Sequence, residues 1–234
     1  ASILMNKLEE ASGYKLSFSD NSSNNCIRFK TNENLGEEGY EIEVDDRQIS
    51  LSAATEKGMF YAIQTFFQLL PAEIESAKPL KMKLSVPAVK IADHPRFSYR
   101  GVMIDVSRHF FTVEELKKQI SVMAMLKLNR LHLHLTDNQG WRIAIDKYPQ
   151  LVEYSAVQET YNEELYGPCY YTKEDIKELV AYADRHHIEV IPEIEFPGHS
   201  LSALVPFPGL SCSGGPFKSE QVFGYEENVF CVGN

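Results

Sequence analysis

LHLHLTDNQGW, residues 131–141, is the stretch that decides the fold, because apolar and polar residues alternate along it until an acidic residue interrupts the pattern. The alternation puts three leucines on one face of a predicted strand and His132 and His134 on the other. A leucine face of this kind is typical of a strand covered by helices. The two histidines then face the interior of a barrel or the opposite side of an open sheet.

The sequence around this stretch alternates between short apolar runs and amphipathic helices. RGVMIDV (100–106) comes before it, and IEVIPEIEFPG (188–198) comes after the second helix. The predicted helices begin after Thr112 and Thr172, both suitable N-caps. Three such units predict a parallel α/β sheet, either doubly wound or barrel-like. Since three strands cannot close an eight-stranded barrel, we expect the first part of a barrel, with open sheet edges that favour self-association.

The N-terminal part of the chain follows a different pattern. We expect residues 1–95 to form a small α+β domain that precedes the α/β region, 96–234. GYEIEVDDRQISLSAA (39–54) alternates around two aspartates and predicts a hairpin, and TEKGMFYAIQTFFQLL (55–70) has apolar residues at helical spacing. The prolines in VPAVKIADHPRF (86–97) mark the boundary, because proline ends both helices and strands.

Composition restricts the partners and the compartment. The chain has 33 acidic and 23 basic residues and a net charge of -10, so we expect no binding to nucleic acid. No apolar run reaches the roughly 20 residues of a membrane helix, so we expect no membrane insertion. Cys212 and Cys231 flank a loop rich in Gly and Pro that a disulfide could close, with two free thiols as the alternative. A bridge predicts a periplasmic, extracellular or cell-surface location after removal of a signal; a lysosomal-type compartment is the weaker alternative, and a cytosolic location stays open.

Polar side chains follow all three predicted strands. Arg108 follows the first strand, Asp137 the second, and Glu195 and His199 the third. Taken singly, a strand-end arginine is more often a surface ion pair, an aspartate can cap a turn and a histidine can be satisfied within its loop. The carboxyl ends of parallel strands, however, carry the binding site in α/β folds. Guanidinium and carboxylate groups bind vicinal hydroxyls, and an aromatic side chain such as Trp141 packs on a sugar ring. The set favours a sugar over a phosphate, because the sequence has no Gly-rich phosphate-binding motif and these positions carry at least two carboxylates to one arginine.

The histidine pair raises the alternative of a metal-dependent barrel hydrolase. Some barrel hydrolases bind a divalent metal through His-x-His at a strand end, and imidazole is a good zinc ligand. His132 and His134, however, come before the turn at Asp137, within the predicted strand. We therefore expect a buried pair, hydrogen-bonded to neighbouring strands with Glu193 as a candidate partner, and no metal or other cofactor. A non-catalytic sugar-binding protein is the second alternative.

Three motifs in this order and spacing resemble the β-N-acetylhexosaminidases of glycoside hydrolase family 20. They are DVSRHFF (105–111), LHLHLTDNQGWRI (131–143) and EVIPEIEFPGHS (189–200). The resemblance covers about residues 95–234 and implies a (β/α)8 TIM barrel behind the small α+β domain. It also implies cleavage of terminal N-acetylglucosamine or N-acetylgalactosamine from the non-reducing end of a glycan or oligosaccharide substrate.

The resemblance assigns a role to each residue at the strand ends. Arg108 matches the family's arginine that holds the outer hydroxyls of the terminal sugar. Asp137 and His199 match a hydrogen-bonded pair that supports the general acid, and Glu195 belongs to the same polar network. The mechanism implied is substrate-assisted: the 2-acetamido oxygen attacks the anomeric carbon while a glutamate protonates the leaving oxygen.

One part of the family pattern is missing from the 234 residues. The family's catalytic Asp-Glu pair follows the fourth barrel strand in a Gly-Gly-Asp-Glu context, which this sequence does not contain. The late acidic doublet Glu226–Glu227 has no apolar strand ahead of it and is interpreted as a solvated turn. We therefore expect the chain to be the N-terminal part of the enzyme and to be inactive alone.

Overall fold

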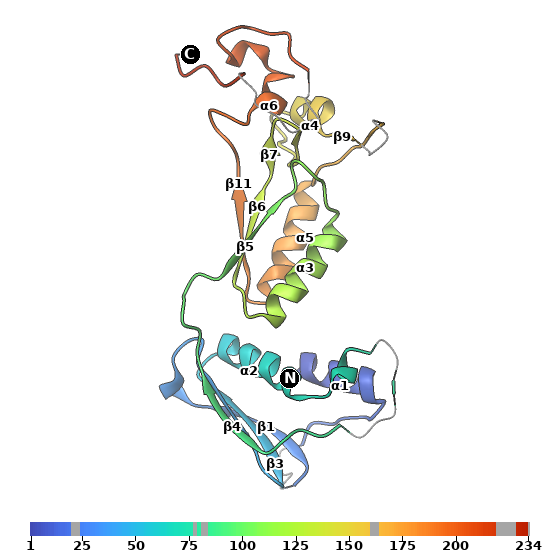
Figure 1. Ribbon diagram of the computed structural model, residues 1–234, viewed down its shortest axis with the longest axis vertical. Helices are drawn as coiled ribbons and strands as arrows, with labels where there is room; N and C mark the ends of the chain where they lie inside the picture. Colours follow the sequence, from blue (N-terminus) through green and yellow to red (C-terminus); the bar gives the residue numbers. More distant parts are fainter. Residues whose placement is uncertain (20–23, 77–78, 81–83, 160–163, 219–227, 234) are drawn as a thin grey trace. The chain divides into compact units, whose positions relative to one another are not determined.

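The computed structural model divides the chain into two compact units, Ala1–Ser98 and Tyr99–Asn234. It describes residues 1–19, 24–76, 79–80, 84–159, 164–218 and 228–233. Each unit contains its own sheet and its own helices (Figure 1). None of the helices in these described segments is long and apolar enough to cross a membrane.

The N-terminal unit is a four-stranded sheet in the order β1-β3-β2-β4, with α1 and α2 on one side of it (Figure 1). β1 is parallel to β3, and the other two pairings are antiparallel. Its elements are α1 (Ser2–Ser12), β1 (Cys26–Thr31), η1 (Glu33–Leu35), β2 (Tyr40–Val44), β3 (Gln48–Ala53), α2 (Glu56–Leu69), η2 (Ala72–Glu75) and β4 (Val89–Asp93).

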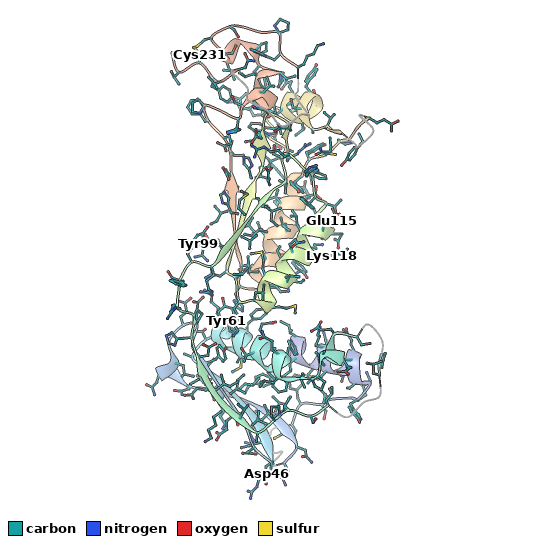
Figure 2. All side chains as sticks on the ribbon, in the orientation of Figure 1. Asp46, Tyr61, Tyr99, Glu115, Lys118 and Cys231 are labelled. Atoms are coloured by element: carbon teal, nitrogen blue, oxygen red, sulfur yellow. A yellow bond between two sulfur atoms is a disulfide. The ribbon has the colours of Figure 1, made fainter. Side chains whose placement is uncertain are left out.

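The predicted hairpin and helix of this unit are confirmed. Strands β2 and β3 pair antiparallel, and Asp45 closes the turn because its Oδ1 accepts from the backbone N–H groups of Arg47 (2.7 Å) and Gln48 (2.8 Å). Figure 2 shows Asp46 at the tip of this turn. Helix α2 begins after Thr55, whose hydroxyl accepts from the backbone N–H of Gly58 at 3.1 Å.

The C-terminal unit is built on the predicted parallel sheet, three strands in the order β11-β6-β5. Helices α3 and α5 lie side by side along this sheet (Figure 1). Its elements are β5 (Gly101–Asp105), α3 (Val113–Met125), β6 (Arg130–His134), β7 (Thr136–Asp137), β8 (Gly140–Trp141), α4 (Gln150–Ser155), β9 (Gln158–Glu159), β10 (Leu165–Tyr166), α5 (Lys173–Asp184), β11 (Glu189–Glu193), α6 (Leu201–Leu204) and η3 (Pro208–Leu210).

Both long helices of this unit begin at the predicted N-caps. The Thr112 hydroxyl accepts from the backbone N–H of Glu115, and the Glu115 carboxylate accepts from the backbone N–H of Thr112 at 2.8 Å. Thr172 and Asp175 form the same reciprocal pair at the start of α5. Figure 2 shows Glu115 on the surface of α3, near the start of that helix.

The leucine face of β6 is buried as expected, but the histidine face differs from the prediction. Leu131 and Leu133 are at most 1% exposed. His134 is buried, whereas the side chain of His132 is 34% exposed to solvent. The prediction of two buried histidines is therefore wrong for His132. His132 lies two residues before His134 in β6, and so further from the loops at the carboxyl end of the strand. The strand also ends at His134, and Asp137 belongs to the short antiparallel pair β7–β8.

Candidate active site

One row of side chains crosses the parallel sheet at its carboxyl end. β6 pairs with both neighbours so that His134 is opposite Asp105 on one side and opposite Glu193 on the other. Residues opposite one another in a parallel sheet project to the same face, so this row is one acid, one imidazole and a second acid. His134 Nδ1 lies 3.3 Å from Asp105 Oδ1, and this interaction raises the pKa of His134.

Asp105 also positions the arginine that follows it. Its Oδ1 accepts from the backbone N–H groups of Ser107 and Arg108, both at 3.0 Å, and its Oδ2 lies 2.7 Å from Arg108 Nη1. Partial burial opposes ionisation of Asp105, but the interactions with His134 and Arg108 outweigh it and hold its pKa well below its ordinary value. Asp105 is therefore an ionised carboxylate that fixes the first strand-end loop.

Asp137 joins the ends of all three strands. Its carboxylate is fully buried, and its Oδ2 lies 2.5 Å from Arg108 Nη2. Its Oδ1 lies 3.0 Å from His199 Nδ1 and accepts from the backbone N–H of Asn138 at 2.6 Å. A residue after β6 thus contacts one residue after β5 and one after β11.

His199 has an unusual backbone conformation. Its φ is 49°, in the left-handed region that L-residues other than glycine seldom adopt, at a cost on the order of 1 kcal/mol or more. Hydrogen bonds hold the segment around it, since Asn138 Oδ1 accepts from the backbone N–H of Leu201 at 3.2 Å. The ring is half exposed, with one nitrogen on Asp137, so its outer edge is accessible to another group at the rim.

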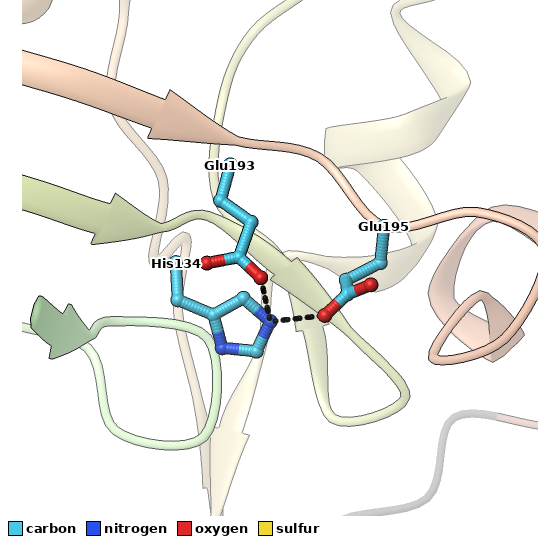
Figure 3. A group of neighbouring side chains, drawn as sticks. All are labelled: His134, Glu193 and Glu195. Atoms are coloured by element: carbon cyan, nitrogen blue, oxygen red, sulfur yellow. Dashed lines mark ion pairs between the residues drawn. The ribbon is translucent and has the colours of Figure 1, made fainter.

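Glu195 reaches the same place through His134. Glu195 Oε1 lies 3.2 Å from His134 Nε2, and Glu193 Oε1 lies 4.0 Å from that nitrogen (Figure 3). The backbone N–H of Glu195 donates to Thr136 Oγ1 at 3.0 Å, which fixes the start of this loop. Glu193 Oε2 lies 2.5 Å from His132 Nε2, so the expected contact between these two residues is present.

Arg142 holds the base of the site, and no sequence pattern singled it out. Its fully buried guanidinium donates to Ser107 O at 2.7 Å, Val157 O at 2.9 Å, Cys169 O at 3.1 Å and Gln158 Oε1 at 3.2 Å. Because all of these acceptors are uncharged, burial lowers its pKa. The side chain ties the loop after β5 to the segment before α5. The one available signal in the sequence is that Arg142 directly follows a tryptophan, Trp141.

Trp141 is part of the core and offers no surface for a sugar ring. It is 9% exposed, packs with Leu151 and Ala203, and donates from Nε1 to Ile143 O at 2.7 Å. The expectation of an aromatic platform at this residue is therefore wrong. An indole next to a strand end has the same sequence appearance whether it faces the rim or the layer beneath it.

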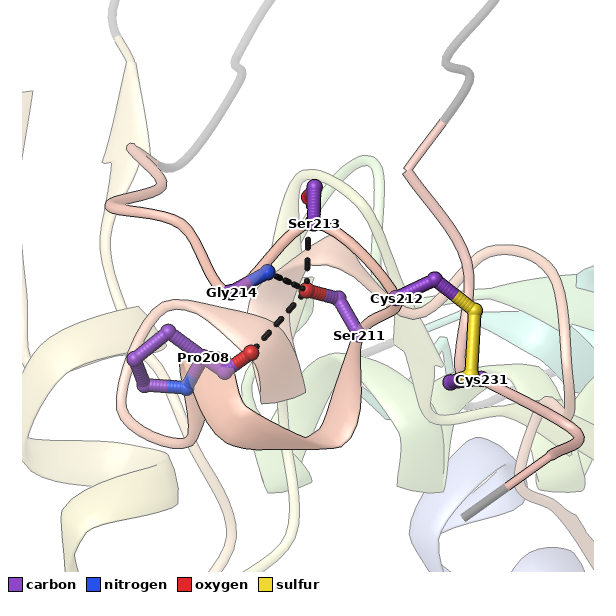
Figure 4. The surroundings of a disulfide bond; sticks show 6 residues. All are labelled: Pro208, Ser211, Cys212, Ser213, Gly214 and Cys231. Atoms are coloured by element: carbon purple, nitrogen blue, oxygen red, sulfur yellow. Dashed lines mark hydrogen bonds between the residues drawn. A yellow bond between two sulfur atoms is a disulfide. The ribbon is translucent and has the colours of Figure 1, made fainter.

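Cys212 and Cys231 form a disulfide (Figure 4). Next to it, the backbone N–H of Phe230 donates to Pro197 O at 3.0 Å and that of Cys231 donates to Leu210 O at 2.7 Å. The bridge therefore fastens a late segment beside the loop that leads to His199. The doublet Glu226–Glu227 lies outside the described residues.

The strand ends together form what we call the rim, the four residues Arg108, Asp137, Glu195 and His199. Asp137 is in direct contact with both Arg108 and His199. Glu195 is connected to them through His134. Guanidinium, imidazole and carboxylates in this arrangement offer both donors and acceptors to a ligand with several hydroxyls. Of the alternative metal pair, only His134 lies where other ligand atoms converge.

Comparison with protein families identifies the chain. The catalytic-domain model of glycosyl hydrolase family 20 matches residues 97–234, and the model of domain 2 of the same family matches residues 1–94. The chain belongs to glycosyl hydrolase family 20. The family predicted from the three motifs is therefore confirmed.

Individual family 20 proteins support the same assignment. A beta-hexosaminidase of Porphyromonas gingivalis is 46% identical over 199 residues, which cover 85% of this chain and 26% of the relative. A beta-N-acetylhexosaminidase of Cellulomonas fimi is 35% identical, covering 85% of this chain and 39% of the relative. The chain thus spans well under half of the length of these relatives.

Solved structures of the family match the whole chain. The beta-N-acetylhexosaminidase of Streptomyces coelicolor A3(2) has a TM-score of 0.92 and 37% identity, covering 100% of this chain and 47% of that one. A mutant beta-hexosaminidase of Streptomyces plicatus, in complex with the product GlcNAc, has a TM-score of 0.91 and 37% identity, covering 100% and 46%. The predicted fold class, a partial TIM barrel that follows a small α+β domain in the sequence, is confirmed by these neighbours.

Proposed function

We propose that the protein containing this chain is a β-N-acetylhexosaminidase that releases terminal N-acetylglucosamine or N-acetylgalactosamine from the non-reducing ends of glycans. The observation that carries this proposal is the joint contact of Arg108 and His199 with the buried Asp137, at the carboxyl ends of three parallel strands. The names of the relatives and the GlcNAc complex of the Streptomyces plicatus enzyme support it.

Arg108 is suited to hold the sugar. Its side chain is 23% exposed, and Asp105 and Asp137 fix its guanidinium from two sides. A guanidinium held in this way has a fixed plane, and its planar geometry suits the recognition of vicinal sugar hydroxyls. Because the Arg108 side chain is already ordered, substrate binding costs little additional side-chain entropy.

Asp137 and His199 are suited to support a general acid. The buried carboxylate orients the imidazole through Nδ1, and the half-exposed ring then presents its other edge to the rim. An imidazole next to a glutamic acid can tune the pKa of that acid and exchange protons with it. In the substrate-assisted mechanism, the glutamic acid protonates the leaving oxygen as the substrate's acetamido oxygen bonds to the anomeric carbon.

We expect the 234-residue chain by itself to be inactive, because the sequence has no Gly-Gly-Asp-Glu segment to supply the general acid. The test is hydrolysis of a chromogenic N-acetyl-β-glucosaminide by the purified chain, with the Porphyromonas gingivalis enzyme as the positive control. Turnover comparable to that control would contradict the expectation.

The function itself is tested in a longer protein that joins this chain to a family 20 Gly-Gly-Asp-Glu segment. We expect it to cleave the N-acetyl-β-glucosaminide and not the matching β-glucoside, which lacks the acetamido group. Arg108→Lys should lower kcat/KM by about 10- to 100-fold through loss of charge-assisted hydrogen bonds. Arg130→Lys, at the opposite end of β6, is the matched control. Equal cleavage of both glycosides would contradict the proposal.

Two further proposals concern the compartment and association. The disulfide between Cys212 and Cys231 supports an oxidising location, periplasmic or extracellular. Strands β5 and β11 are the outer strands of the described three-stranded sheet, and unpaired edges support association between copies. Size-exclusion chromatography of the chain tests the second proposal, and a stable monomer at high concentration would contradict it.

A further inference from the structure

We propose that His134, Glu193 and Glu195 form a binding site for a divalent transition-metal cation of the zinc type, beneath the rim. One imidazole nitrogen and one oxygen from each carboxylate converge there, all within 4.8 Å of one another (Figure 3). Imidazole and carboxylate are a ligand combination that zinc uses at sites with three protein ligands.

The imidazole nitrogen is the first reason for this assignment. His134 is 4% exposed, and among the described residues its Nε2 makes no hydrogen bond. Glu195 Oε1 at 3.2 Å and Glu193 Oε1 at 4.0 Å lie near this nitrogen without the alignment of a hydrogen bond. A buried polar atom of this kind calls for a partner, and a cation placed between the three atoms would satisfy all of them together.

The distances suit such a cation. With bonds of about 2.0–2.2 Å to nitrogen and oxygen, two ligands of a tetrahedral zinc ion lie about 3.4 Å apart. The His134–Glu195 separation of 3.2 Å is close to that value, and the His134–Glu193 separation of 4.0 Å needs a small side-chain rotation. Solvent can supply the fourth ligand, because both glutamates are partly exposed.

Each proposed ligand is held in place by a neighbour. Asp105 lies at Nδ1 of His134, the arrangement that leaves Nε2 facing a metal. His132 Nε2 lies on one oxygen of Glu193 at 2.5 Å, so the other oxygen faces His134. The backbone N–H of Glu195 donates to Thr136. These contacts orient the His134 ring and the Glu193 carboxylate and fix the backbone of Glu195 before a cation arrives.

The charge balance favours a cation as well. Within the described residues, the network around His134 contains four carboxylates, and Arg108 is the guanidinium that pairs with two of them, Asp105 and Asp137. The ion pairs of Glu193 and Glu195 are with the histidines of β6, His132 and His134. A divalent cation would balance these two carboxylates where they approach the imidazole.

Zinc binding is tested on the purified, untagged chain by isothermal titration with zinc chloride, and by the visible absorption of cobalt as a probe of coordination geometry. We expect one equivalent of zinc per chain and much weaker binding of magnesium, because imidazole favours transition metals. Glu195→Gln, Glu193→Gln and His134→Gln should each weaken zinc binding by tenfold or more. Glu189→Gln, at the other end of β11, is the matched control.

Failure of wild-type protein to bind zinc, or equal binding by the control and all three variants, would overturn the proposal. Far-UV circular dichroism confirms that each variant is folded, and the two glutamine substitutions at glutamate keep the side-chain shape. The measurement uses no glycoside, so it stands apart from the proposed hydrolase activity. Loss of that activity would leave the zinc result unchanged.

Discussion

Asp105 is the residue that connects the sheet to the rim. Its two oxygens serve three groups: the His134 ring, the backbone of the following loop and the Arg108 guanidinium. A neutral amide in its place could accept hydrogen bonds, but it would remove one of the two carboxylates that pair with Arg108 and the carboxylate beside His134 Nδ1. The position therefore requires an acid for an electrostatic reason.

The lowered pKa of Asp105 predicts a pH dependence of stability. A carboxyl whose pKa is lower in the folded state stabilises the fold above its ordinary value of 3.8, and this contribution is lost as the pH falls below that value. We expect Asp105→Asn to reduce the free energy of unfolding at pH 7 by about 1–2 kcal/mol, allowing for solvent screening, and by less at pH 3. Urea unfolding at both values measures this. Exposed Asp184→Asn is the control, and a constant difference at both pH values would contradict the prediction.

Gly140 is required by the buried guanidinium beneath the site. A Cβ on Gly140 would lie 2.3 Å from Cζ of Arg142, whose donors are already committed to four acceptors. We expect Gly140→Ala to lower the free energy of unfolding by about 1–3 kcal/mol through overpacking. Gly209→Ala, where a Cβ meets nothing within 4 Å, is the control. Thermal unfolding of the two variants decides, and equal melting temperatures would refute the explanation.

At the scale of elements, the caps of the helices make a measurable contribution. Thr112 and Glu115 satisfy each other's backbone N–H groups at the start of α3. We expect Thr112→Ala to lower the free energy of unfolding by about 1 kcal/mol, and Thr112→Ser to restore most of it because a hydroxyl remains. Urea unfolding tests the pair. Equal loss in both variants would show that the methyl group matters and not the cap.

The same elements show what sequence periodicity can and cannot predict. The alternation in β6 and the caps at Thr112 and Thr172 are local, so strands, helix starts and the buried leucine face were predictable. The anchoring by Arg142 depends on residues 15 and 27 positions away, Val157 and Cys169, and the orientation of Trp141 depends on packing against Leu151 and Ala203. No local pattern records such contacts.

The rim shows the same division between local and distant information. Strand ends identified Arg108, Asp137 and His199 as neighbours, because parallel strands end at one edge. The sequence pattern predicts Glu193 as a candidate partner of the histidine pair, but it does not predict that Asp105 and Glu193 lie on either side of His134. That arrangement depends on the register between strands, which is set by the whole sheet.

At the scale of the whole molecule, the four cysteines divide into a disulfide and two thiols. Cys212 and Cys231 are bonded over a separation of 19 residues, and Cys26 and Cys169 are not part of a disulfide. We expect two thiols to react with Ellman's reagent in denaturant and four after reduction. In the native protein Cys169 should react slowly, because it is 2% exposed and burial raises its pKa. Four reactive thiols without reductant would contradict the pairing.

The row formed by Asp105, His134 and Glu193 has a consequence for the history of the molecule. Hydrogen bonds keep neighbouring strands about 4.8 Å apart, so the intervals along this row are fixed by the sheet. Insertions or deletions in the loops beyond the strands leave these intervals unchanged. A lineage could therefore lengthen, shorten or exchange those loops many times and inherit the same spacing of charges. A protein engineer who grafts new loops onto this chain would retain it in the same way.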